Sequence, residues 1–303
     1  MTADYYRKKT TDLLNNVEMP RSSGYTTALR NIGSIRNSGF ELQLDGRIID
    51  RAVKWDLGVN FSLNRSKVLV LSEDKDIFGG ELDNTILKDQ LNLMRVGEPM
   101  YVFYGYVEDG YDENGHIVYK NMDDDPAITA ADKTIIGDPN PDFLVNLTTA
   151  VSYKGFTLSA FFQSSTGNDI YSLSMAAQAY DYGYNGNTLR EVYYNHWTPE
   201  NPTAKYPNLD QTSYKMSDRF VYDGSFVRLK NLELAYDVPC ARNKFIKRAR
   251  VYVSAQNLFT ITSYPFWDPD INANGGGSSM IQGVDSYCYP SARTYTIGCR
   301  LTF

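Results

Sequence analysis

Strict alternation of apolar and polar residues is the dominant pattern of this chain. In the stretch VKWDLGVNFSLN, the odd positions from Val53 to Leu63 are all apolar, and the even positions from Lys54 to Asn64 are polar or glycine. Successive side chains of a β-strand point to opposite faces of the sheet. The stretch therefore predicts a strand with one apolar face and one polar face.

Similar alternation predicts three hairpins and three further strands. FELQLDG joins the 53–64 stretch through a turn at residues 50–51, and DFLVNLTTAVSYKGFTLSAFFQSS turns at residues 154–155. SFVRLKNLELAYDVP and RARVYVSAQNLF form the third pair, joined by residues 239–247. With ADYYRKKTTDLL, YVFYGYVED and the terminal ARTYTIGCRLTF, the pattern predicts roughly nine strands and an all-β fold.

The predicted connections fall into a short set and a long set. Residues 164–225 and 70–141 are each about 60 residues long or more, far beyond an ordinary hairpin loop. Short turns on one side and long loops on the other are typical of bacterial outer-membrane barrels, whose strands need about 9 to 11 residues. The alternative is a soluble β-sandwich, whose apolar face packs against a second sheet and whose tyrosine-rich loops bind glycans.

Composition supports the all-β interpretation and reduces the classes of binding partner that the chain could have. The chain has 24 Tyr, 14 Phe and 22 Gly residues, and aromatic residues favour strands while glycine favours turns. The formal charge of -6 is spread along the sequence, which argues against nucleic acid as a partner. Cys240, Cys288 and Cys299 lie far apart and are expected to be isolated thiols. The N-terminal sequence lacks the apolar core of a signal peptide, so the chain either stays in the cytoplasm or is incomplete.

Several short motifs, in this order and with this spacing, resemble one known family. They include DYYRKKTTDLL, NIGSIRNSGFELQLDGRII, DKTIIGDPNPDF, WTPENPTAKYP, SDRFVYDGSFVRLKNLELAYDVP, RARVYVSAQNLFTITSY and YPSARTYTIGCRLTF. Together they resemble the SusC/RagA family of TonB-dependent outer-membrane transporters, over essentially the whole chain. The resemblance implies an antiparallel transmembrane β-barrel in the cell outer membrane, with long extracellular loops.

In that family the barrel has 22 strands around an N-terminal plug. We expect residues 1–303 to supply roughly nine to twelve C-terminal strands, with the plug and the N-terminal strands absent. The chain is therefore expected to be a fragment, a truncated gene product or a processed half. By the same resemblance, Tyr295, Ile297, Leu301 and Phe303 of the last strand form the signal that the barrel-insertion machinery recognises. In the alternative interpretation, Phe303 is a buried apolar anchor.

The same resemblance implies a function in nutrient uptake. The complete protein is expected to import oligosaccharides or peptides, capped by a SusD-like surface lipoprotein and driven by the TonB complex through the plug. The protein is expected to lie in outer-membrane lipid. It is expected to bind no nucleic acid, to have no resident cofactor and to be no enzyme. A β-rich glycosidase is a further alternative, but two acids such as Asp123 and Asp125 in one flexible loop are weak evidence for it.

The acidic stretch KNMDDDPAITAADK suggests a calcium loop. Pro126 stands where an EF-hand has the glycine of its sharp turn, and proline cannot adopt that conformation. A solvated acidic loop is therefore the alternative to a Ca²⁺ site. On EF-hand spacing, the oxygen ligands would come from Asn121, Asp123, Asp125, the Ala127 carbonyl, Thr129 and Asp132.

Aromatic residues in the predicted loops are candidates for substrate binding. Such residues stack on sugar rings or peptide side chains, but they also anchor protein interfaces and pack loops together. The candidates for substrate contact are Tyr182, Tyr184, Tyr194, Trp197 and Trp267.

Overall fold

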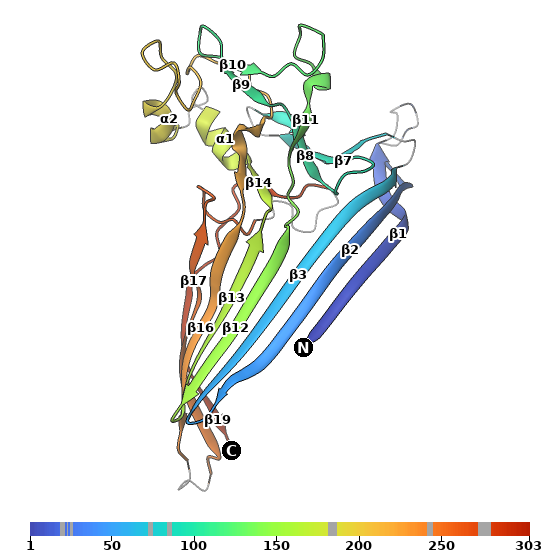
Figure 1. Cartoon of the computed structure of the whole chain (residues 1–303). Helices are drawn as coiled ribbons and strands as arrows, with labels where there is room; N and C mark the ends of the chain where they lie inside the picture. Colours follow the sequence, from blue (N-terminus) through green and yellow to red (C-terminus); the bar gives the residue numbers. More distant parts are fainter. Residues whose placement is uncertain are drawn as a thin grey trace.

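One sheet of eight long antiparallel strands forms the wall of the molecule (Figure 1). The computed structural model describes residues 1–18, 22, 24, 27–71, 75–83, 87–180, 187–240, 245–271 and 280–303. The strands follow one another across the sheet in chain order, each hydrogen-bonded to the next. They are β1 (Thr2–Glu18), β2 (Thr27–Asp50), β3 (Val53–Leu71), β12 (Phe143–Tyr153), β13 (Phe156–Thr166), β16 (Phe226–Val238), β17 (Arg248–Thr262) and β19 (Thr294–Thr302).

The three predicted hairpins are confirmed at the expected positions. Residues 51–52 join β2 to β3, residues 154–155 join β12 to β13, and residues 239–247 lie between β16 and β17. Lys154 and Gly155 both have positive φ, 47° and 87°, as a type I′ hairpin turn requires. The twist of this turn matches that of the flanking strands, so a two-residue connection is sufficient.

The register keeps apolar and polar residues in separate rows across the wall. Val59 lies between Leu44 of β2 and Leu147 of β12, whereas the next residue, Asn60, lies opposite Gln43 of β2. Because side chains alternate, every strand that follows this register contributes to both rows. The predicted two-faced strands are therefore confirmed.

The apolar face of the wall remains open in the part of the chain that the structure describes. Leu158, Leu234 and Val253 are 47%, 45% and 47% exposed. The described segments contain no second sheet that covers this face, and their other sheets have two to four short strands each. The soluble β-sandwich alternative is therefore wrong, because its second sheet would bury these side chains.

The polar face of the wall meets the loops at its upper end. Ser66 of β3 accepts a hydrogen bond from the backbone N–H of Met100 at 3.2 Å. Ile35, Val68 and Met94 are buried in a small apolar cluster at the same level. The polar face is thus the inner face of the wall.

The long connections fold into a separate layer beyond one end of the wall (Figure 1). Within the described residues, no helix is long and apolar enough to cross a membrane. The layer's helical turns are η3 (Ala130–Asp132), α1 (Leu173–Tyr180), α2 (Arg190–Tyr194) and η4 (Asp218–Phe220). Its strands are β4 (Ile77–Phe78), β5 (Glu81–Asp83), β6 (Lys88–Gln90), β7 (Asn92–Met94), β8 (Val102–Gly105), β9 (Glu108–Tyr111), β10 (Ile117–Tyr119), β11 (Thr134–Gly137), β14 (Asp169–Ser172), β15 (Val221–Asp223) and β18 (Val284–Asp285).

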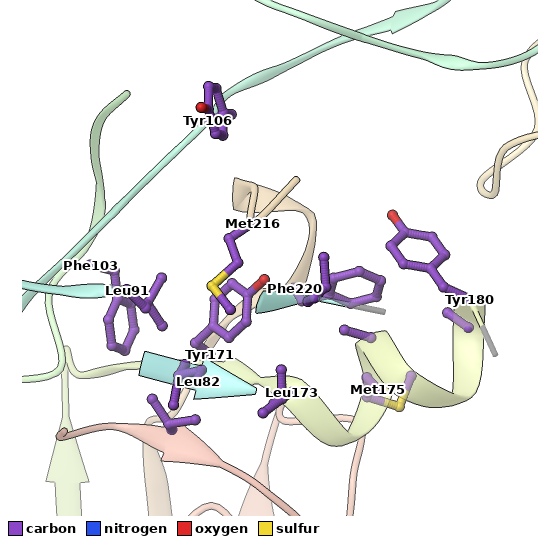
Figure 2. Close-up of a cluster of buried hydrophobic side chains, with 14 of the residues drawn as sticks. Leu82, Leu91, Phe103, Tyr106, Tyr171, Leu173, Met175, Tyr180, Met216 and Phe220 are labelled. Atoms are coloured by element: carbon purple, nitrogen blue, oxygen red, sulfur yellow. The ribbon is translucent and has the colours of Figure 1, made fainter. Parts of the chain in front are cut away.

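An apolar core holds this loop layer together. Figure 2 shows Leu91, Phe103, Tyr171, Met216 and Phe220 gathered from separate segments of the chain. Phe103 and Tyr171 have no exposed surface, and their rings pack edge to face with centroids 6.2 Å apart. Burial of each large apolar side chain contributes about 1.5–3 kcal/mol, so the loops hold one another in place.

One predicted wall strand belongs to the loop layer instead. YVFYGYVED forms β8 and β9, which pair with the loop strands β7, β11 and β10. Val102 and Phe103 are adjacent and both are buried, because this segment packs on both faces inside the loop core. The described wall therefore has eight strands, and the prediction of roughly nine to twelve is too high.

A buried ion pair cross-links the loop layer between η4 and β9. Arg219 Nε donates to Glu108 Oε2 at 2.7 Å, and Ser217 Oγ donates to Glu108 Oε1 at 2.6 Å. The side chains of Arg219 and Glu108 are 16% and 9% exposed. Burial alone would lower the pKa of Arg219, but the bonds to Glu108 outweigh it and raise that pKa above its ordinary value.

We expect the two faces of β3 to tolerate charge very differently. Val59→Arg places a cation near the middle of the apolar rows, where contact with lipid would cost about 2–4 kcal/mol. Asn60→Arg places the same cation on the polar face and serves as the matched control. The amount of folded, heat-modifiable barrel in outer-membrane fractions should decrease for Val59→Arg and stay at the wild-type level for Asn60→Arg. Equal loss in both variants would contradict this assignment of the faces.

Glu108→Gln keeps the side-chain shape but removes the charge that Arg219 faces. Breaking one side of a buried pair costs about 3–5 kcal/mol, so the loop layer should open more often. Asp109→Asn changes the exposed neighbour and is the control. Limited trypsin digestion of the assembled barrel should cut the loop layer faster in Glu108→Gln and at the wild-type rate in Asp109→Asn. An unchanged rate for Glu108→Gln would show that the pair does not hold the layer.

Candidate functional site

A cavity of about 340 Å³ lies between the wall and the segment that follows β17. We call this segment the inner strap, meaning the described residues 263–271 and 280–293. The cavity is bounded on one side by β16 and β17 and on the other by the inner strap. Its lining includes Arg228, Asn257 and Thr260 from the wall and Trp267, Asp268 and Arg293 from the strap.

Arg228 joins the wall to the inner strap. Its side chain is 2% exposed and forms an ion pair with Asp268. Nε donates to Thr260 Oγ1 at 2.9 Å, and Nη1 donates to Ser291 Oγ at 3.1 Å. Asp270 lies 3.4 Å from Nη1 as a second carboxylate. The guanidinium therefore binds four side chains, one from β17 and three from the two described parts of the inner strap.

Asp268 is held as an anion in this network. Its Oδ1 accepts from the backbone N–H of Asp270 and its Oδ2 from that of Ser291, both at 2.9 Å. Burial by itself would raise the pKa of Asp268, but these N–H donors together with Arg228 lower it below its ordinary value. A buried charge with this many partners fixes the strap against the inner face.

Asn257 places an unpaired acceptor beside the cavity. Its backbone is left-handed, with φ of 51°, and lies where the β16–β17 register shifts. Its Nδ2 donates to the Ala292 carbonyl at 3.0 Å. Its Oδ1 is buried and has no hydrogen-bond partner among the described residues. Nearly all buried polar atoms in proteins are paired, so this acceptor is an exception within the described part of the chain.

The predicted aromatic residues have different environments. Trp267 is 56% exposed, lines the cavity and stacks on Phe266 with ring centroids 4.8 Å apart. Tyr194 is 66% exposed at the end of α2, away from the residues that line the cavity. Trp197 packs against the turn at Gly115, where an added Cβ would lie 2.3 Å from its ring. Of the described candidates, the structure brings only Trp267 to the cavity.

Tyr182 and Tyr184 lie outside the described residues. Their assignment to substrate contact stays a prediction.

The acidic loop forms a chain of side-chain turns. Asn121 Oδ1 accepts from the N–H of Asp123 at 3.1 Å, and Asp123 Oδ1 accepts from the N–H of Asp125 at 2.9 Å. Asp125 Oδ1 accepts in turn from the N–H of Ala127 at 3.0 Å. Each side chain thus accepts a hydrogen bond from the backbone N–H two residues ahead, which is the Asx-turn that Asn and Asp commonly form in loops.

Asp132 closes the acidic loop from beneath. It has no exposed surface and accepts from the N–H groups of Met122 and Thr129, both at 2.7 Å. These backbone donors lower the pKa of Asp132 below its ordinary value. Thr129 Oγ1 accepts from the N–H of Ala131 and completes a capping box. Among the described residues, no group of three or more His, Cys, Asp or Glu residues is placed to hold a metal ion, so the Ca²⁺ site stays a prediction.

The terminal strand presents its apolar side chains on one open face. Tyr295, Ile297 and Leu301 of β19 are 70%, 87% and 45% exposed, and Phe303 follows the strand with 72% exposure. Phe303 is therefore not a buried anchor in this structure. Recognition of these four residues by the insertion machinery stays a prediction.

The Arg228 network and the Glu108–Arg219 pair are not found by the sequence analysis. In the sequence, Arg228 is one polar position among many in an alternating strand. The only local signal is the stretch FWDPD, which contains Asp268, a second aspartate and one of the three tryptophans of the chain. Forty residues separate Arg228 from Asp268, and no spacing rule links residues that far apart.

Comparison with known proteins identifies the family of this wall. A family model described as "TonB dependent receptor-like, beta-barrel" matches residues 1–258. TonB-dependent receptor P3 of Formosa agariphila is 32% identical, over 100% of this chain and 32% of its own length. TonB-dependent receptor SusC of Bacteroides thetaiotaomicron is 29% identical, over 99% of this chain and 30% of its own length. The chain spans about a third of the length of the curated relatives it matches.

Solved structures agree with the sequence relatives. The RagAB peptide importer in its closed-closed state superposes with a TM-score of 0.83 at 27% identity, over 99% of this chain and 33% of that chain. The RagAB peptide transporter gives a TM-score of 0.80. Proteins of this type are outer-membrane receptors and transporters and not enzymes, so the glycosidase alternative is wrong. The chain belongs to the TonB-dependent receptor-like β-barrels of the outer membrane, in their SusC/RagA branch.

Proposed function

We propose that this chain forms part of the wall and loop layer of an importer for oligosaccharides or peptides. The observation that carries the proposal is the cavity at the inner strap, which combines an aromatic face with hydrogen-bonding groups. Ligand sites commonly pair apolar or aromatic walls with a few placed polar groups. The RagAB neighbours are named as a peptide transporter and a peptide importer, which supports the peptide class.

The chemistry of the cavity suits a polar chain molecule. The half-exposed ring of Trp267 offers a stacking surface for a sugar ring or a peptide side chain. Asn257 lines the cavity, and a side-chain amide is a group that hydrogen-bonds a hydroxyl or a peptide N–H. Arg293 is exposed at the cavity and would pair with a substrate carboxylate.

We infer that further strands close the barrel. β1 and β19 are the two edges of the sheet, and each has a single strand partner among the described residues. Unpaired backbone groups in hydrocarbon cost several kcal/mol each, so membrane sheets close on themselves. The curated relatives are about three times as long as this chain, which leaves room for the other strands and for a plug that contacts the TonB complex.

The outer surface of the loop layer offers a docking place for a SusD-like lipoprotein. Tyr193 and Tyr194 of α2 are 59% and 66% exposed, and their rings pack edge to face at 5.2 Å. Tyrosine is enriched at the centres of protein interfaces. We propose that this tyrosine pair contacts the lipoprotein that caps the transporter.

Trp267→Ala should weaken substrate binding to the complete transporter by about two- to tenfold, because an aromatic contact adds about 0.5–1.5 kcal/mol to its burial. Tyr289→Ala is the matched control, since Tyr289 lies on the same strap, is 90% exposed and does not line the cavity. Calorimetric titration with a defined peptide pool and, separately, with an oligosaccharide pool identifies the substrate class. Wild-type affinity of Trp267→Ala for both pools would exclude the cavity as the binding site.

Replacing both Tyr193 and Tyr194 by alanine should reduce capture of a tagged SusD-like lipoprotein from the same bacterium by about tenfold or more. Tyr289→Ala again controls for loss of an exposed aromatic ring. The measurement is the amount of transporter that copurifies with the lipoprotein from detergent extracts. If the double variant copurifies as well as wild type, the lipoprotein docks elsewhere.

A further inference from the structure

Five cationic side chains gather on the outer face of the wall where its apolar rows end. The strands β1, β2 and β3, which carry them, lie side by side at one edge of the sheet (Figure 1). In one row, Lys9 pairs with Arg36 and Arg36 pairs with Lys67. In the next row, Arg7 and Arg65 stand on either side of Ser38. We call these five residues the cationic belt: Arg7, Lys9, Arg36, Arg65 and Lys67.

The register places the belt on the same face as the apolar rows. From Val59 to Lys67 the pairing of β3 with β2 continues without a shift, so Leu63, Arg65 and Lys67 all point away from the inner face. The row next to Arg7 and Arg65 consists of Tyr5, Phe40 and Leu63. The outer face therefore changes from apolar to cationic within a single step along the strands.

The position of the belt along the strands corresponds to the level of the lipid headgroups in the outer leaflet. The apolar positions of β3 run from Val53, next to a short turn, to Leu63. Ten residue steps cover about 33 Å along a strand, which tilt reduces to about 25 Å, the height of the apolar band of such barrels. The next outward residues, Arg65 and Lys67, lie at the end that leads into the long loops, which is the extracellular end.

Among the described residues, little negative charge lies close enough to neutralise the belt. Arg65 pairs with Asp142 at 2.6 Å. Asp12, in the β1 bulge above the belt, accepts from Asn31 Nδ2. Within the part of the chain that the structure describes, Arg7, Lys9, Arg36 and Lys67 have no carboxylate partner. Arg7, Lys9 and Lys67 are exposed, and Arg36 is partly buried between its neighbours.

We propose that the cationic belt binds the phosphate groups of a phosphorylated glycolipid, lipopolysaccharide, in the outer leaflet. The two cationic rows are about 7 Å apart along the strands and each spans three strands about 4.8 Å apart, which is wide enough for more than one phosphate. The apolar rows below, including Phe40 and Phe61 with ring centroids 6.4 Å apart, contact the acyl chains of the same lipid. Clustered Lys and Arg at the edge of an apolar surface attract anionic lipid headgroups.

This inference rests on the outer-membrane position of the wall but not on the proposed substrate or lipoprotein. A loss of lipid binding with unchanged substrate binding would therefore leave the proposed function untouched, and the reverse result would leave the belt untouched.

β1 and β3 each offer an outward and an inward lysine, which gives a matched pair of double variants. Lys9→Gln with Lys67→Gln removes two charges from the belt. Lys8→Gln with Lys54→Gln removes two charges from the inner face of the same strands. The complete transporter, purified in dodecyl maltoside and delipidated, is titrated with lipopolysaccharide, with lipid A stripped of both phosphates, and with inorganic phosphate.

We expect the outward double variant to bind lipopolysaccharide about tenfold or more weakly than wild type, because each cation near a headgroup adds about fivefold. The inward double variant should bind like wild type. Wild type should bind the dephosphorylated lipid weakly, and millimolar inorganic phosphate should not displace lipopolysaccharide. This last arm separates a lipid site from a site for free phosphate.

Equal affinity of the outward and inward variants would overturn the proposal, as would equal affinity of wild type for lipid with and without phosphate. The comparison of the two lipids needs only the wild-type protein, so it decides the question even if the outward variant fails to assemble. Displacement by inorganic phosphate alone would also overturn the lipid assignment.

Discussion

Hydrogen bonding between neighbouring antiparallel strands is the constraint on which the rest of this structure depends. The pairing fixes which residues share a face, and a slip by one residue would exchange the two faces completely. Because Val59 faces Leu44 while Asn60 faces Gln43, the slip would place a polar residue or glycine of one strand opposite an apolar residue of the other. The faces of the wall, and hence its membrane position and its lumen, follow from this register.

The inner face holds the loops through contacts of a different kind. The core around Phe103 and Tyr171 gives the loop layer its own stability, and Arg219 with Glu108 locks two of its segments together. Arg228 performs the same task between the wall and the inner strap, where Asp268 supplies the compensating charge. Buried pairs contribute little net free energy, but separating one is costly. Their effect is therefore to restrict the strap, and Trp267 on it, to a narrow range of positions at the cavity.

The wall was predictable from the sequence because its signals are local. Period-two alternation and a turn such as Lys154-Gly155 determine a hairpin without reference to the rest of the chain. The sequence assigns YVFYGYVED to the wall because valine and aromatic residues favour strands, whereas Val102 and Phe103 are buried on both sides inside the loop core. Long loops with a core of their own leave no periodic signal.

The candidate site was predictable only in part. Trp267 was found because an aromatic residue in a polar loop is conspicuous, but Trp197 shares that feature and packs against Gly115 instead. The pairing of Arg228 with Asp268 depends on the path of the inner strap along the wall. No residue spacing in the sequence predicts that path. The cationic belt is similar: its members come from three strands, and only the register shows that they meet.

One short stretch of β3 connects these separate observations. Arg65 and Lys67 point outward at the upper limit of the apolar band, while Ser66 between them points inward and accepts the N–H of Met100 from the loop layer. Val68, the next inward residue, is fully buried beneath the same loops. Successive residues of a strand point to opposite faces of the sheet. The position of the outward cations along β3 and the position where the loop layer contacts β3 therefore cannot change independently. If the cationic belt binds headgroups as proposed, the level of Arg65 and Lys67 in the membrane also fixes the level of the loops that Ser66 and Val68 contact.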